Sequence, residues 1–247
     1  MLLSVVAVTP SPGPSAPGRI EQITEQIATR QPTPTWLALL TGLVALLFAG
    51  TALAARLGAS SHEGMHAFTG GLVGKVDGVR IPRKGPSGTT VQAKGPSKFT
   101  ATFVGYLGPS FFGLLGAWLL SRDHPVAVLW LAIVSFGVLF WLMQNFYGGL
   151  LAVAFGGALL LIAWNANVLA QTAVAYFLVW SLLLFGSRDV APSLAAAARK
   201  IDPKAKTKSE YLQLREMTYV PQIVWVLVHL VLCWVALAFG AWLLLVA

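Results

Sequence analysis

Long apolar runs alternate with short polar connectors along most of this chain. A helix needs about 20 apolar residues to cross the hydrocarbon core of a bilayer, and most of these runs reach that length. We expect membrane-spanning helices at residues 36–56, 99–121, 126–144, 146–164, 168–187 and 220–246. Short connectors predict that consecutive helices lie antiparallel. The pattern therefore predicts an all-α polytopic membrane protein with about six to seven membrane helices.

One further helix is predicted after the first span, at residues 58–74. This stretch is rich in glycine and only moderately apolar, so we expect other helices rather than lipid to enclose it. We expect the chain to bend at Leu57 to Ser61, where the helix begins. Because the helix is short for a full crossing, it fits a tilted path, a re-entrant path or a continuation of the first span.

Two basic stretches interrupt the apolar pattern. Residues 75–98 contain six of the 17 Lys and Arg residues, and residues 188–219 contain seven. Short loops rich in Lys and Arg stay on the cytoplasmic side of a membrane, and the four predicted spans between the two stretches place both on one side. We therefore predict a multi-pass protein of the cell membrane with a cytoplasmic N-terminus. The second stretch is predicted to be a long polar loop.

The first basic stretch contains a predicted β-hairpin. Two β-capable runs, Val76–Ile81 and Thr89–Gln92, flank a turn region rich in Pro and Gly. A plain basic loop is the alternative. The favoured interpretation adds one small cytoplasmic sheet to an otherwise helical protein.

The N-terminal arm differs in composition from the rest of the chain. Residues 1–35 carry six prolines, which is typical of a disordered segment. Within the arm, Arg19 to Arg30 can form a short amphipathic helix on the membrane surface. We therefore divide the chain into an arm at 1–35 and a membrane-embedded domain at 36–247.

The composition excludes a soluble globular domain of this size. Hydrophobic residues make up 56% of the 247 residues and charged residues only 11%, with a mean hydropathy of +0.72. The formal net charge of +8 lies mainly in the two basic stretches, where attraction to anionic lipid accounts for it. No aromatic-interleaved basic motif is present, so we expect the lipid bilayer and no nucleic acid as a partner. The single cysteine, Cys233, excludes an intramolecular disulfide and a Cys-rich metal site.

The predicted helix at 58–74 carries an H-E-x-x-H motif, and its two histidines are half of the four in the chain. Residues four apart share one face of a helix, so His62 and His66 can direct two imidazoles at one Zn²⁺ ion. Glu63 is placed to accept a proton from a water that the metal activates. A structural cluster of paired side chains is the alternative, but ionisable groups within membrane sequence are costly and usually functional.

A catalytic zinc usually has three protein ligands, so one more is needed. Asp189 ends a predicted span and is the remaining cytoplasmic carboxylate nearest the membrane. A charge at a helix end, paired with Arg188, is its alternative role. Glu210 is the competitor, and its alternative role is a solvated loop charge. Asn145, between two spans, can ligate through its amide oxygen, position a substrate or cap a turn.

Several segments follow the motif in order. The motif itself continues to Phe68 and Gly70. The later segments are Val79-Arg80-Ile81, Gly105-Tyr106-Leu107-Gly108-Pro109-Ser110, Gln144-Asn145-Phe146-Tyr147-Gly148, Ser209-Glu210-Tyr211-Leu212 and Thr218-Tyr219-Val220-Pro221. With these segments the chain resembles the M50 family of membrane metallopeptidases, the site-2 protease class, and more narrowly its M50B-like actinobacterial type. The resemblance spans residues 36–246.

The resemblance implies zinc-dependent proteolysis of a membrane-protein or peptide substrate, within or beside the membrane. His62 and His66 would be zinc ligands and Glu63 the general base. Site-2 proteases present an extended substrate to a short sheet near the motif, which the hairpin would do by strand addition. A catalytically inactive membrane scaffold or regulatory protein with the same fold is the alternative function.

The chain departs from the family pattern at the third ligand. Site-2 proteases take it from an Asp followed by Gly in a later span, and no such pair follows Asp77-Gly78 here. M50B-type relatives are expected to have Ser-Asp where this chain has Ser209-Glu210. That correspondence favours Glu210 more than the sequence alone does, and it leaves Asp189 as the other candidate.

Overall fold

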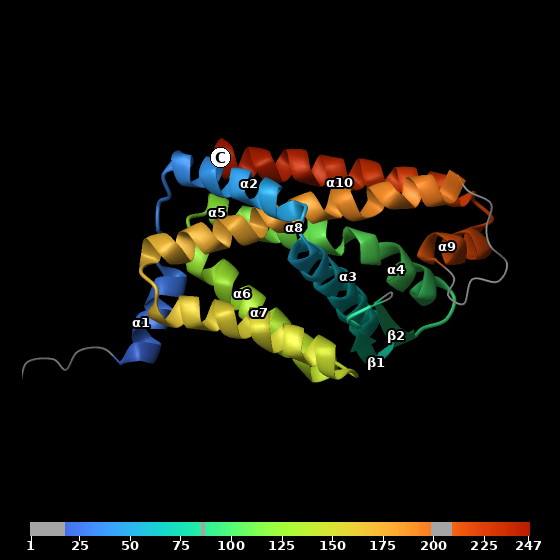
Figure 1. Cartoon of the computed structure of the whole chain (residues 1–247), viewed down its shortest axis with the longest axis horizontal. Coiled ribbons are helices and arrows are strands. Elements are labelled where there is room, and N and C mark those ends of the chain that lie inside the picture. The colour runs from blue at the N-terminus through green and yellow to red at the C-terminus, as the bar shows by residue number, and fades with distance from the viewer. Residues whose placement is uncertain (1–17, 85–86, 199–208) are drawn as a thin grey trace, which may run out of the picture.

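The computed structural model describes residues 18–84, 87–198 and 209–247. The described chain is mainly helical, with one two-stranded sheet near one end of the helices (Figure 1). The predicted fold class, an all-α polytopic membrane protein with a small β-hairpin, is confirmed.

Four helices lie side by side and form the main bundle (Figure 1): α2 (Thr35–Ala49), α5 (Gly108–Ser121), α8 (Val168–Ala198) and α10 (Gln222–Leu245). Helix α8 contacts the other three. Glycines allow this close packing, since a Cβ at position 240 or 113 would lie 2.6 or 2.9 Å from the side chain of Leu183. Leu183 is completely buried at this junction.

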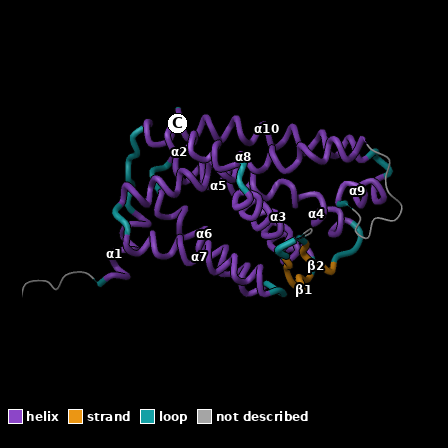
Figure 2. The backbone as a smooth tube through the Cα atoms, in the orientation of Figure 1, coloured by secondary structure: helices purple, strands orange, loops and turns teal. Residues whose placement is uncertain are grey.

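Helices α6 (Pro125–Leu142) and α7 (Phe146–Asn165) form an antiparallel pair beside this bundle. They diverge from α8 along their length, and the turn that joins them lies beside the sheet (Figures 1 and 2). The turn therefore brings residues 143–145 close to the hairpin.

Five helical segments among the described residues are long and apolar enough to cross a membrane: Pro96–Ser121, Pro125–Leu142, Phe146–Asn165, Val168–Arg188 and Gln222–Leu245. Helices α2 and α3 (Ala52–Val73) form a sixth candidate only as a pair, which is bent by 97°. The described chain thus offers five or six spans, and the upper value agrees with the lower end of the expected six to seven.

The predicted bend at Leu57 to Ser61 is wrong, because α3 runs through these residues without a break. The bend lies at Gly50 and Thr51, where the Thr51 hydroxyl accepts a hydrogen bond from the amide of Ala54 at 3.1 Å and caps α3. Ser60 and Ser61 donate their hydroxyls to carbonyls within α3, so these polar residues are accommodated by the helix.

The predicted hairpin is confirmed. Strands β1 (Lys75–Arg80) and β2 (Gly88–Gln92) pair antiparallel, with an irregularity in register between Val76 and Gly78. The hairpin lies on the C-terminal part of α3, where a Cβ on Gly70 would come within 2.8 Å of Val91. The glycines of this helix therefore let the sheet approach the motif.

The predicted loop at 188–219 is wrong in part. Helix α8 continues to Ala198, because the Ala-rich run after the apolar segment favours a helix. Helix α9 covers Glu210–Thr218. Ser209 caps α9 through its hydroxyl, which accepts from the amide of Leu212 at 3.2 Å. At the other end of the chain, α1 (Arg19–Ala28) agrees with the predicted short helix, whereas the first 17 residues of the arm lie outside the described part.

Candidate metal centre

Helix α3 positions the two histidines of the motif, and α9 brings a carboxylate to them. The Nε2 atoms of His62 and His66 lie 3.2 Å apart. Glu210 Oε1 lies 3.1 Å from His62 Nε2 and 2.9 Å from His66 Nε2. The three potential ligand atoms all lie within 4.8 Å of one another, so one ion can reach all of them.

The structure brings one of the two candidates for the third ligand to the histidines. Glu210, the competitor, lies with the histidines even though it is 144 residues from His66 in sequence. Asp189 lies on α8, and its side chain falls outside the described part of the structure. The first residue of α9 thus supplies a carboxylate to the site, although it is far from the histidines in sequence.

The chemistry of these side chains fits a zinc ion. Two imidazole nitrogens and one carboxylate oxygen are a usual set of protein ligands at a catalytic zinc. His66 Nδ1 lies 2.8 Å from the carbonyl oxygen of Ala101, so it donates to that carbonyl and leaves Nε2 free to bind a metal. Glu210 Oε2 is buried and has no hydrogen-bond partner among the described residues, which fits a carboxylate oxygen that a metal ion would satisfy.

The histidines also stabilise the charge of the carboxylate. Burial alone raises the pKa of Glu210, but hydrogen bonds from His62 and His66 and the charges of these side chains lower it to about 2. These contacts favour the ionised carboxylate, which is the form that binds a metal ion.

The segment between α4 (Pro96–Val104) and α5 forms one wall of the site. It is a short 3-10 helix, η1 (Gly105–Leu107). A Cβ on Gly105 would lie 2.2 Å from His66 Nε2, so only glycine leaves this imidazole in place. Tyr106 contacts the edge of the His62 ring at a centroid distance of 4.8 Å and stacks on Tyr211, which follows Glu210.

Glu63 is buried, with an exposed fraction of 2%, and lies between the metal-site histidines in sequence. Its Oε2 accepts a hydrogen bond from the hydroxyl of Thr89 at 2.7 Å. This residue of β2 was not among the predicted site residues, and nothing in the sequence beyond its place in the hairpin distinguishes it. The main-chain carbonyl of Ala101 was missed for a similar reason, because a backbone acceptor leaves no signal in residue type.

Asn145 lies against the hairpin. Its Nδ2 donates to the carbonyl of Ile81 at 2.9 Å, and its Oδ1 accepts from the amide of Ile81 at 3.0 Å. The preceding residue, Gln144, donates its backbone amide to the carbonyl of Val79 at 2.9 Å. The turn between α6 and α7 therefore covers the outer edge of β1, and Asn145 holds the end of that strand.

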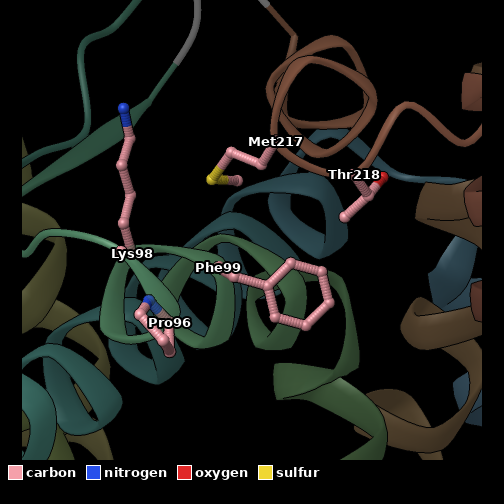
Figure 3. A pocket seen from close by; sticks show the side chains of 6 residues that line it. Pro96, Lys98, Phe99, Met217 and Thr218 are labelled. Atoms are coloured by element: carbon pink, nitrogen blue, oxygen red, sulfur yellow. The ribbon is translucent and has the colours of Figure 1, made fainter.

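A shallow hollow of about 510 Å³ lies between the start of α4 and the end of α9. Figure 3 shows Phe99 of α4 facing Met217 and Thr218 of α9 across it. None of the three metal-site residues lines this hollow. It marks the contact between the helix that holds His66 through Ala101 and the helix that carries Glu210.

The structure combines apolar helices long enough to span a membrane with a potential His-His-Glu metal site. The buried Glu63 lies beside one of the two histidines in the H-E-x-x-H helix. The family model described as Peptidase M50B-like matches residues 36–243. The chain therefore belongs to the M50 family of membrane metallopeptidases. No curated protein and no solved structure matches the chain.

Proposed function

We propose that this chain is a zinc-dependent intramembrane endopeptidase that cleaves membrane-protein substrates near the cytoplasmic face. The observation that carries the proposal is the convergence of His62, His66 and Glu210, with His66 Nδ1 already bonded to a carbonyl. These three residues would hold the ion. Membership of a metallopeptidase family supports hydrolysis of a peptide bond as the reaction.

The residues around the site have separate roles in this reaction. A bound zinc ion would lower the pKa of a water molecule and polarise the scissile carbonyl. Glu63 accepts the proton of the attacking water at a carboxylate oxygen and later passes it to the nitrogen of the leaving amine. Ala101 orients the imidazole of His66 through its carbonyl. Gly105 leaves the space that this imidazole occupies.

The hairpin offers a strand edge to which an extended substrate can bind. The turn at 143–145 covers the outer edge of β1, whereas the outer edge of β2 pairs with no other strand among the described residues. An extended peptide can add to such an edge through main-chain hydrogen bonds. A transmembrane helix must unwind before it binds in this way, so segments with weak helix propensity are the expected substrates.

The distribution of charge supports a cytoplasmic location for the site. The basic stretch at 75–98 contains the hairpin, and the stretch at 188–219 contains α9. Both face the cytoplasm under the positive-inside rule. We accordingly place the protein in the cell membrane, with the lipid bilayer and membrane-protein substrates as its partners.

Removal and return of the metal test this proposal. We expect purified protein in detergent to cleave fluorescently labelled casein, whose backbone is already extended. Treatment with a chelator should abolish cleavage, because Glu63 alone does not activate water sufficiently, and one equivalent of Zn²⁺ should restore it. The measurement is the initial rate of fluorescence release before chelation, after chelation and after zinc is returned.

A zinc-loaded protein that cleaves neither casein nor single-span membrane proteins would contradict the proposed activity. That result would favour the alternative, a catalytically inactive M50-like scaffold or regulatory protein. Magnesium added in place of zinc is the matched control, since Mg²⁺ prefers oxygen ligands and should not restore cleavage at a site with two imidazoles.

A further inference from the structure

We propose that Thr89 is a positioning residue that orients the Glu63 carboxylate and couples it to the strand that binds the substrate. The inference rests on the proposed function. The Thr89 hydroxyl lies 2.7 Å from Glu63 Oε2 and 3.1 Å from the main-chain oxygen of Glu63. One side chain of β2 therefore contacts both the backbone and the carboxylate of the general base.

The hydrogen bond from Thr89 restricts the orientation of the Glu63 carboxylate. Glu63 is buried, and a buried carboxylate needs a hydrogen-bond donor to offset the loss of water. Threonine suits this role because its branched side chain has few rotamers and holds the hydroxyl in one direction. Because Oε2 accepts the Thr89 hydroxyl, Oε1 is the oxygen left to accept the proton of the attacking water.

Strand geometry restricts this role to one threonine. Successive side chains of a strand point to opposite faces, so Thr89 faces α3 whereas its neighbour Thr90 is exposed. The other anchors of the hairpin contact its backbone away from Glu63. Asn145 binds Ile81, and Arg56 donates to the carbonyl of Pro82 at 3.0 Å.

This arrangement links substrate binding to the position of the base. A peptide that adds to the outer edge of β2 is aligned by the main chain of the same strand that carries Thr89. The scissile carbonyl and the Glu63 carboxylate are then both positioned by one rigid element. Loss of the hydroxyl should therefore slow the chemical step more than it weakens binding of the substrate.

The test compares three variants of the full-length, zinc-loaded protein with labelled casein as the substrate. Thr89→Val removes the hydroxyl and keeps the shape, Thr89→Ser keeps the hydroxyl, and Thr90→Val makes the same change on the exposed face. We expect Thr89→Val to lower kcat by about ten- to a hundredfold with KM nearly unchanged. Thr89→Ser should recover most of the lost kcat. Thr90→Val should lower kcat far less than Thr89→Val, because the hydroxyl that contacts Glu63 belongs to Thr89.

Hydrogen exchange of the metal-free proteins gives a second readout that does not depend on activity. Amides of residues 88–92 should exchange faster in Thr89→Val than in Thr90→Val, because the tether to α3 is lost. A wild-type kcat in Thr89→Val, an equal loss in Thr89→Ser, or equal exchange in the two valine variants overturns the inference. A wild type that binds zinc but cleaves nothing contradicts the proposed function instead, and the exchange rates still decide whether Thr89 tethers the hairpin.

Discussion

Replacing Glu63 with glutamine should abolish cleavage while the metal stays bound. Glutamine has the size of glutamate and keeps an oxygen that can accept the Thr89 hydroxyl, so the fold around α3 should be retained. It cannot accept the proton of the attacking water. Loss of a general base typically lowers the rate by a factor of about 10² to 10⁴. We expect kcat to fall by at least about 10².

The measurement pairs the rate of casein cleavage with the zinc content of the same sample. Equal zinc in the wild type and in Glu63→Gln would show that the loss of rate is chemical. Cleavage within a factor of a few of the wild-type rate would contradict the assignment of Glu63 as the base. A variant that binds but does not cleave is also suited to capturing substrates from the native membrane.

Replacing Glu210 with alanine should remove the metal. Its Oε1 lies 3.1 Å or less from both histidine nitrogens, so it is the carboxylate best placed to complete the site. Loss of a partner that only orients a ligand already lowers metal affinity by about 10- to 100-fold. Loss of a ligand itself should cost more, and we expect Glu210→Ala to be isolated without zinc.

Two other carboxylates serve as controls for this experiment. Glu216 lies exposed on the same helix, α9, so Glu216→Ala should keep its zinc. Asp189→Ala tests the other candidate for the third ligand directly. Retained zinc in Glu210→Ala together with lost zinc in Asp189→Ala would show that the carboxylate of α8 completes the site.

Local periodicity made much of this protein predictable. Apolar runs of about 20 residues indicate spans without any knowledge of their neighbours, and their positions agree with α5 to α8 and α10. The pairing of His62 with His66 was equally predictable, because a spacing of four residues places both on one face of any helix. The hairpin followed from two β-capable runs around a turn.

Tertiary contacts were harder to predict. Glu210 is 148 residues from His62, and only the packing of α9 against α4 and α10 brings it to the site. Nearness to the membrane favoured Asp189 as the third ligand, but that argument takes no account of a helix that folds back. The bend between α2 and α3 was misplaced because Ser60 and Ser61 resemble a helix break in sequence and yet bond within the helix.

The most direct test of a zinc site is the metal content of the purified protein. Wild type and His66→Ala should be prepared in detergent under conditions in which both are folded, and zinc should be counted per chain. We expect about one zinc per wild-type chain and none in His66→Ala, because the variant loses one of three ligands. A folded wild-type protein that binds no zinc would contradict the metallopeptidase assignment of this chain and favour an inactive membrane scaffold.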